Sequence, residues 1–272
     1  MKKQGRNELC NCGSGLKYKY CCAGKDLREQ KIPLWSDPKT GEKLSLNMTD
    51  DILNWAATVE LPIKNFCKDN DIYFFGLAAT VGETQELDNK LKKGLLTKQD
   101  VLDTFKKNAK KESIMRLLDA CFEEMEIFAA RRTILKDAFD AHFNEKYTLS
   151  IPALFSQLEG LLRDIGGLHF KDTIKPTIPT NIWDKKLLFA IKDDAQNFNN
   201  FITKLFSGST GPDAFNRNPI LHGFKLDYHS EEHSLLIILS ILELRMFNWW
   251  QRNVEDFTNR FQVSKIDRKK EE

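Results

Sequence analysis

Apolar residues recur at helical spacing along most of the chain after residue 50. Thr49 or Asp50 has a residue type that caps a helix, and a second helical stretch is expected over 72–93. Thr97-Lys-Gln-Asp100 has the composition of an N-cap and predicts a third helix. No sustained alternation of apolar and polar residues, which would indicate strands, is found. The pattern therefore predicts an all-α body.

The longest apolar stripe runs from Glu112 to about Glu145. Its members recur at intervals of three, four or seven residues, and they are Ile114, Leu118, Cys121, Met125, Phe128, Leu135, Phe139 and His142. Such intervals place side chains on one face of a helix with 3.6 residues per turn. We therefore expect a single long helix over this stretch.

Three further helices are expected downstream. They cover approximately 153–165, 184–206 and 230–262. For the first, Ser150 is the expected N-cap, Pro152 lies near the first turn, and Gly166-Gly167 ends the helix. The last helix is very apolar in its first half. Together with the long stripe, these segments predict a four-helix bundle over 112–262.

The composition agrees with a folded globular chain. The 272 residues leave room for one large or two modest domains, and 41% apolar residues with 19 Phe and 5 Trp are too many for a disordered chain. No apolar run approaches the roughly 20 residues that a membrane span needs. The first residues lack the apolar region of a secretory signal. We therefore expect a cytoplasmic protein without a membrane partner.

Charge and cysteine are concentrated near the N-terminus. Residues 1–31 hold eight Lys/Arg against three Asp/Glu, although the whole chain has a net charge of only +2. Four of the six cysteines lie within the same segment, at Cys10, Cys12, Cys21 and Cys22. Four thiolates suit a tetrahedral zinc ion, and a segment this short has almost no core with which to fold unaided. Free or disulfide-linked thiols remain the alternative, although neighbouring Cys21 and Cys22 would form a strained disulfide.

The two remaining cysteines, Cys67 and Cys121, stand alone in helical segments. A lone cysteine in such a segment is most often a small apolar residue of the core. We expect both to be buried and to take no part in metal binding.

The segment GRNELCNCGSGLKYKYCCAGK resembles the SEC-C zinc-binding motif, named for the C-terminal segment of the SecA translocation ATPase. Asn11 replaces the usual proline and Leu16 the usual lysine. The resemblance implies that the four clustered cysteines bind zinc. Because four thiolates leave no open position, that zinc would be structural. It also implies an adaptor module that docks to protein, ribosome or nucleic acid, and it does not imply catalysis.

A second motif, Arg217-Asn218-Pro-Ile-Leu-His222, lies just before the last predicted helix. An arginine followed at this spacing by a histidine is a weak pattern, and Arg163 and His169 form another match. Arg163 is adequately explained by its place near a helix C-terminus, where its charge is favourable. The first match differs because Asn218 follows the arginine directly and the proline and two aliphatics anchor the backbone.

The Arg217–His222 stretch, with the helices around it, resembles the HEPN family of small α-helical domains. Many HEPN domains are ribonucleases of toxin–antitoxin and phage-defence systems. The resemblance implies a homodimer in which two copies of the motif line one cleft, with RNA as the substrate. It is specific only around 217–223, although the helical plan extends over 112–262.

The residue types suit metal-independent RNA cleavage. Histidine titrates near neutral pH and can remove the proton of a 2′-hydroxyl or supply one to the leaving 5′-oxygen. Arginine is a permanent planar cation that fits phosphate oxygens. Asn218 either orients the histidine or contacts phosphate. In the alternative interpretation, His222 packs at a turn and Arg217 forms a surface salt bridge. If either residue is buried in a private salt bridge, the nuclease interpretation fails.

Glu159 is a carboxylate inside an otherwise apolar helix. An ion pair with Arg217 or Arg163 would explain its position there. His229 and His233 have the spacing of a metal-binding pair, but no third ligand is evident, and they are expected to be structural or solvent-facing, like His142.

The sequence thus predicts three parts: a zinc module over 1–31, a linker and accessory helices over 32–110, and a HEPN-like bundle over 111–265. The expected function is an endoribonuclease targeted by its zinc module. The alternative is a non-catalytic adaptor that binds RNA, the ribosome or a partner protein.

Overall fold

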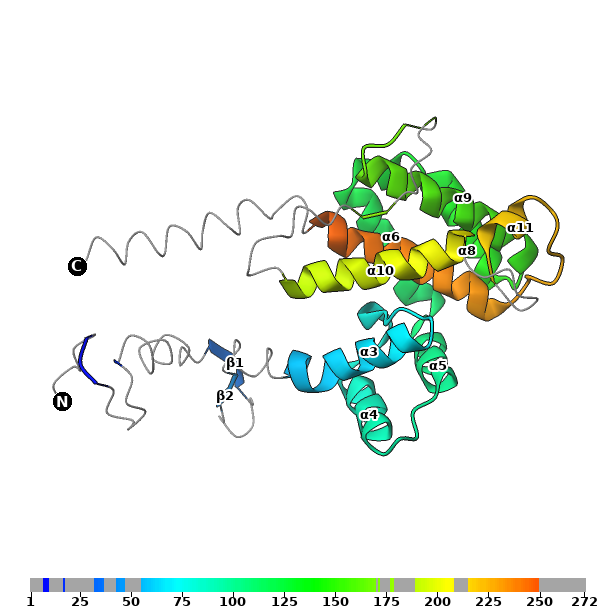
Figure 1. Cartoon of the computed structure of the whole chain (residues 1–272). Helices are drawn as coiled ribbons and strands as arrows, with labels where there is room; N and C mark the ends of the chain where they lie inside the picture. The colour runs from blue at the N-terminus through cyan, green and yellow to red at the C-terminus, as the bar shows by residue number, and fades with distance from the viewer. Residues whose placement is uncertain are drawn as a thin grey trace. The chain divides into compact units, whose positions relative to one another are not determined.

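The computed structural model describes residues 7–9, 17, 32–36, 43–46, 55–169, 171, 177–178, 189–207 and 215–249. The chain divides into two compact units, Met1–Ile63 and Lys64–Glu272, and each is described by itself (Figure 1). Residues 64–110, which precede the expected bundle, belong to the same unit as the helices that follow them.

The first unit contains a two-stranded antiparallel hairpin. Strand β1 (Ile32–Ser36) pairs with β2 (Lys43–Leu46), and an irregularity separates Pro33 from Trp35 in the register. Proline lacks the N–H that a regular ladder requires, so it is tolerated at such an irregularity or at an edge. Residues 32–47, which are expected to be a linker, therefore include a small sheet.

A π-helix, η2 (Ala56–Glu60), precedes α3 (Leu61–Asp69). Pro62 follows the π-helix almost directly, and because proline has no N–H it cannot donate to a carbonyl of the preceding turn. The sequence predicts that the helical pattern bends or restarts at this proline; in the structure the helix type changes at Leu61, while the helical run continues without a gap from 55 to 69. The possible caps at Thr49 and Asp50 lie outside the described residues.

The second unit is helical in all its described elements, and the predicted all-α class is confirmed. Its α-helices are α4 (Val81–Lys92), α5 (Lys98–Asn108), α6 (Lys111–Glu124), α7 (Glu126–Ala129), α8 (Arg132–Phe143), α9 (Tyr147–Ile165), α10 (Phe189–Ser207), α11 (Arg217–Leu221) and a final helix over 231–249. None of the described helices has the length and apolarity required to cross a membrane.

The helix expected over 72–93 is shorter than predicted. Residues 72–75 have no regular secondary structure, and a short 3-10 helix, η3 (Gly76–Ala78), separates them from α4. Ile72, Tyr73, Phe74 and Phe75 are all buried. A run of four buried apolar residues has no helical period, because a helix with one buried face would expose part of it.

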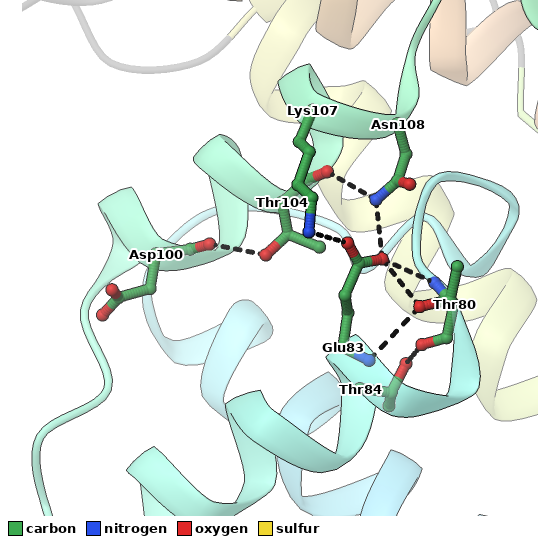
Figure 2. Close-up of polar contacts among 7 residues, drawn as sticks. All are labelled: Thr80, Glu83, Thr84, Asp100, Thr104, Lys107 and Asn108. Carbon is green, nitrogen blue, oxygen red and sulfur yellow. Dashed lines mark hydrogen bonds and ion pairs between the residues drawn. The ribbon is translucent and has the colours of Figure 1, made fainter.

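Helices α4 and α5 both begin with a capping box. Thr80 and Glu83 form the first, and Thr97 and Asp100 form the second, as the sequence pattern at 97–100 predicts. Glu83 also accepts a hydrogen bond from Asn108 (2.7 Å) and pairs with Lys107 (2.8 Å). Figure 2 shows this carboxylate between the start of α4 and the end of α5. One side chain therefore fixes the relative position of the two helix ends.

The single helix expected over 112–145 is wrong in continuity, because the structure divides it into α6, α7 and α8. The first break is at Met125, whose φ of −137° and ψ of 116° are extended. The apolar stripe nevertheless stays buried from Ile114 through Phe139, because each short helix turns its apolar face inward. No Gly or Pro occurs between 112 and 145, so the local sequence carries no signal for the break.

Helix α9 begins earlier than expected, and Ser150 is not its N-cap. The helix starts at Tyr147, and the Ser150 hydroxyl is buried 2.7 Å from that of Ser234 in the final helix. The predicted end is confirmed, since Gly166 is the C-cap and Gly167 has a φ of 64°. Pro152 lies inside α9 and cannot donate to the carbonyl of Thr148, which instead accepts the hydroxyl of Tyr228 at 3.2 Å.

The final helix is the centre of this unit. Its residues from Ser234 to Leu244 are all buried, as the apolar sequence there predicts. Phe247 packs against Phe198 of α10, with the ring centroids 5.3 Å apart. Helices α8 and α9 pack closely against each other, and α11 contacts both α9 and α10. This packing determines where the Arg217–His222 stretch lies.

Candidate functional site

The stretch from Arg217 to His222 forms a separate five-residue helix, α11. Asn216 is its N-cap, is buried, and accepts a hydrogen bond from the Asn218 N–H at 3.0 Å. Ile220 is buried and attaches the helix to the core. His222 is the C-cap, and Gly223 follows with a φ of 73°, which favours glycine. The motif therefore begins and ends with one short helix.

Arg217 lies partly inside the protein, with 25% of its side chain exposed. Its guanidinium forms an ion pair with Glu159 of α9, donates to the Asn218 side-chain oxygen at 3.1 Å, and lies 5.5 Å from the centre of the Phe206 ring. Its Nε is buried without a hydrogen-bond partner. These contacts fix the plane of the guanidinium.

Glu159 also pairs with the Nε of Arg163 at 3.1 Å. The prediction that Glu159 binds Arg217 or Arg163 is confirmed, and it binds both. Arg163 in addition donates to the backbone carbonyl of His169 at 3.0 Å. The arginines of the two Arg–His matches are far apart in the sequence, and both pair with the carboxylate of Glu159. We call Glu159, Arg163 and Arg217 the arginine–glutamate cluster.

His222 and Asn218 are both exposed. No described hydrogen bond or ion pair joins His222 to Arg217. His222 comes five positions after Arg217, and a helix turns roughly 100° per residue, so their side chains leave α11 in directions about 140° apart. The structure therefore places both residues on one element but does not bring them into contact.

The salt bridge considered as an alternative for Arg217 is present. It is not private, because Glu159 is shared with Arg163, and it is not fully buried, because part of each side chain is exposed. His222 forms no such pair among the described contacts. The arrangement leaves an exposed histidine close in the chain to a positioned arginine, and Asn218 accepts a hydrogen bond from that arginine.

Two other histidines, His142 and His233, have structural surroundings. His142 is buried, and its Nδ1 lies 2.9 Å from the Ser234 hydroxyl; burial lowers its pKa to about 4. His233 stacks on Phe215 at 3.8 Å, and burial lowers its pKa to about 4 as well. His229 lies before the final helix and His233 lies within it, so these two histidines do not share a helix face. No group of three or more metal-binding side chains occurs in the part of the chain that the structure describes.

Sequence reasoning missed a second ion pair beside the cluster. Arg131 donates to Asp164 at 2.8 Å, and a Cβ on Gly160 would lie 2.7 Å from the Arg131 Nη2. Gly160 therefore leaves the space in which the Arg131 guanidinium lies. A glycine inside an apolar helix was the available signal, because such a residue costs stability unless another group needs the space.

The predicted zinc ligands Cys10, Cys12, Cys21 and Cys22 lie outside the described residues. Nearby, Leu9 and Lys17 pair in an isolated antiparallel bridge. The donor set itself suits zinc, since four thiolates match the coordination number and softness of that ion. The two other cysteines, Cys67 and Cys121, are buried as expected, and burial raises the pKa of each thiol to about 12.

The comparison with protein families agrees with the N-terminal interpretation. The SEC-C motif model matches residues 6–24, a span that contains all four clustered cysteines. No curated protein and no solved structure matches the chain. The match covers a small part of the chain and describes that part alone. Residues 6–24 are therefore similar to the SEC-C motif.

Proposed function

We propose that this protein is a metal-independent endoribonuclease of the HEPN type, of the toxin or phage-defence class, with an N-terminal zinc module that targets it. The observation that carries the proposal is the geometry of α11. Helix α11 exposes Asn218, its C-cap His222 is also exposed, and Glu159 holds the guanidinium of Arg217 by an ion pair. A base, a polar group and a positioned cation are the groups that phosphoryl transfer from a 2′-hydroxyl needs.

The reaction we propose is an internal transesterification of RNA. The imidazole of His222 removes the proton of the 2′-hydroxyl, the 2′-oxygen bonds to phosphorus, and the bond from phosphorus to the 5′-oxygen breaks. The 5′-oxygen takes a proton from an acid, and the product keeps a 2′,3′-cyclic phosphate. Arg217 and Asn218 face the extra negative charge on the phosphate oxygens. None of these steps uses a metal ion.

A homodimer follows from the need for both an acid and a base. One imidazole cannot easily fill both roles in the same step, because one role needs the neutral ring and the other the protonated ring. Two copies of α11 facing one cleft would supply both. We therefore propose that two copies of this chain form the active site together.

The N-terminal module has a structural role in this proposal. Cys10, Cys12, Cys21 and Cys22 would hold one zinc ion, which supplies the cross-link that a short segment without a core needs. The folded module would then bind a protein, the ribosome or nucleic acid in the cytoplasm.

The test is RNA cleavage by the purified full-length protein with EDTA present, comparing the wild type with His222→Ala. We expect cleavage with a 2′,3′-cyclic phosphate end for the wild type and its loss in the variant. His229→Ala, which removes another exposed histidine, is the matched control and should cleave normally. Activity that survives in His222→Ala would refute the proposed role of this residue. Circular dichroism of each sample separates lost activity from lost structure.

The second candidate is a non-catalytic adaptor, and the ion pair between Arg217 and Glu159 favours it, because a paired arginine has less charge to offer phosphate. In that case the SEC-C-like module would carry the function through RNA, a partner protein, or the ribosomal or secretion machinery. Cys21→Ser would then abolish binding to the partner, and His222→Ala would change nothing. Cleavage that depends on His222 excludes this candidate as the whole function.

A further inference from the structure

The loop that follows α11 exposes an aromatic ring. Phe224 is 84% exposed, the largest value among the large apolar residues that the structure describes, and Leu226 is 78% exposed. The loop lies between α11 and the final helix (Figure 1). A phenylalanine exposed to this degree is not part of the core. Phe224 lies only two residues after His222, the proposed catalytic residue.

The ring is attached to a well-ordered turn. The backbone N–H groups of Phe224 and Lys225 both donate to the carbonyl of Pro219, at 2.8 and 3.0 Å. Gly223 donates to Ile220 at 3.1 Å and adopts the positive φ that closes the turn. Because Pro219 and Ile220 belong to α11, these bonds join the backbone of the turn to that helix. The backbone of Phe224 is therefore held close to His222.

The far end of the loop is also anchored. The hydroxyl of Tyr228 donates to the carbonyl of Thr148 in α9, the group that Pro152 leaves without a helical donor. The loop is thus tied to α11 at one end and to α9 at the other, and the exposed ring lies between them.

The residues around the ring in the chain are polar and carry both charges. Exposed Asn218 and His222 precede it, Lys225 follows it, and exposed Asp227 comes three residues after it. Arg217, at the start of α11, keeps part of its side chain exposed although it pairs with Glu159. Proteins that bind single-stranded nucleic acid stack aromatic rings on bases while cationic side chains bind the backbone. A protein partner would favour a broad continuous apolar area, whereas Phe224 and Leu226 are two side chains among polar neighbours.

We propose that Phe224 stacks on an unpaired base of RNA next to the phosphate that is bound at His222. The inference rests on the proposed function for its choice of RNA, and it adds the substrate class, which is single-stranded RNA. A paired base has no free face for the ring, so duplex RNA is excluded. Stacking does not distinguish bases strongly, and we expect little sequence preference from this contact.

The experiment uses full-length protein and a single-stranded 2′-O-methyl RNA that carries one 2-aminopurine. This RNA cannot be cleaved through its 2′-position, so binding is measured apart from activity. Stacking on the ring should change the fluorescence of the 2-aminopurine. Phe224→Ala should weaken binding about tenfold and remove the fluorescence change. Phe224→Tyr should retain both, and Leu226→Ala, the matched exposed apolar control, should resemble the wild type.

The outcomes separate this inference from the nuclease proposal. Binding that needs Phe224 supports the inference even where no RNA is cleaved. Equal binding by Phe224→Ala and wild type, or no binding by the wild type, overturns it. Sedimentation measures the oligomeric state of the same variants. A change from dimer to monomer in Phe224→Ala would show that the ring contacts a second copy of the chain, and this too overturns the inference.

Discussion

Glu159 of α9 pairs with Arg217 of α11 and, one turn further along its own helix, with Arg163. A single carboxylate therefore balances two guanidinium groups. Because the side chains are only partly exposed, loss of the negative charge leaves two cations close together with little water to screen them.

Glu159→Gln tests whether this pair positions a catalytic group. We expect the variant to lose about 2 kcal/mol of unfolding free energy, since a partly buried pair is broken on one side. RNA cleavage should fall roughly tenfold or more if Arg217 must be held in place. Asp164→Asn, which removes the neighbouring carboxylate from Arg131, should leave cleavage unchanged. Normal cleavage by Glu159→Gln would assign the cluster to stability alone.

Because the proposed module binds zinc through four cysteines, the protein should have a defined zinc content. The purified chain should contain one zinc ion, measured by elemental analysis, and Cys10→Ser or Cys22→Ser should lose it. Cys67→Ala should keep the metal, although it is expected to be less stable because Cys67 is buried. Zinc that persists in Cys10→Ser would contradict the ligand set.

Since burial raises the pKa of Cys67 and Cys121 to about 12, neither thiol should react with an alkylating reagent at pH 8 in the folded protein.

Burial of His142 predicts a loss of stability in acid. Its pKa falls from an ordinary 6.5 to about 4, so below pH 6.5 the unfolded chain binds a proton that the folded chain does not. The contribution is fully present above pH 6.5 and is lost as the pH falls to about 4. The total is on the order of 3 kcal/mol.

Urea unfolding of His142→Gln between pH 7 and 4 measures this effect. The variant should depend less on pH than the wild type, whatever its stability at pH 7. His229→Gln, at an exposed histidine, should keep the wild-type slope. An unchanged slope in His142→Gln would show that this ring is not the group that titrates.

Glu83 predicts a separate effect at lower pH. Hydrogen bonds from Lys107 and from Thr80 lower its pKa to about 2 (Figure 2). Its contribution is therefore present above pH 4.5 and is lost as the pH falls towards 2. At pH 7, Glu83→Gln should cost about 1 kcal/mol, because the capping box is weakened. Glu86→Gln, on the exposed side of the same helix, should leave thermal unfolding within error of the wild type.

The effect on stability of a substitution at Gly160 should depend on whether Arg131 is present. Alanine normally stabilises a helix by about 1 kcal/mol relative to glycine, but here its Cβ would displace the Arg131 guanidinium. Gly160→Ala alone should give no net gain, and the same change in an Arg131→Ala background should stabilise by about 1 kcal/mol. Gly82→Ala has open space around its Cβ and is the control. Equal effects in both backgrounds would contradict the close packing.

Much of the fold could be predicted because its signals are local. The burial of the stripe from Ile114 to Phe139 follows from spacing alone, and so does the capping box at Thr97. The breaks around α7 could not be predicted, since Met125 is extended for reasons of tertiary packing that no Gly or Pro announces. Ser150 has a capping residue type, but its partner is Ser234, far along the chain.

The candidate site, like the fold, could be predicted only in part from the sequence. Its position before the last helix and the need of Glu159 for a cationic partner could be inferred from residue types. That both Arg163 and Arg217 use this carboxylate depends on how α9 and α11 pack, and no spacing in the sequence reports it. The exposure of Phe224 could not be predicted either, because a phenylalanine is most often buried in a core.

Pro152 has a consequence beyond the geometry of α9. Since an imino acid has no hydrogen to give, the helix cannot close its own bond to Thr148, and Tyr228 takes that place. An alanine at 152 would restore the internal bond and compete directly with the tyrosine. The donor that this carbonyl accepts thus determines whether the far end of the Phe224 loop is bound to α9, and the residue that leaves the carbonyl to Tyr228 lies on a different helix from the one that the loop follows.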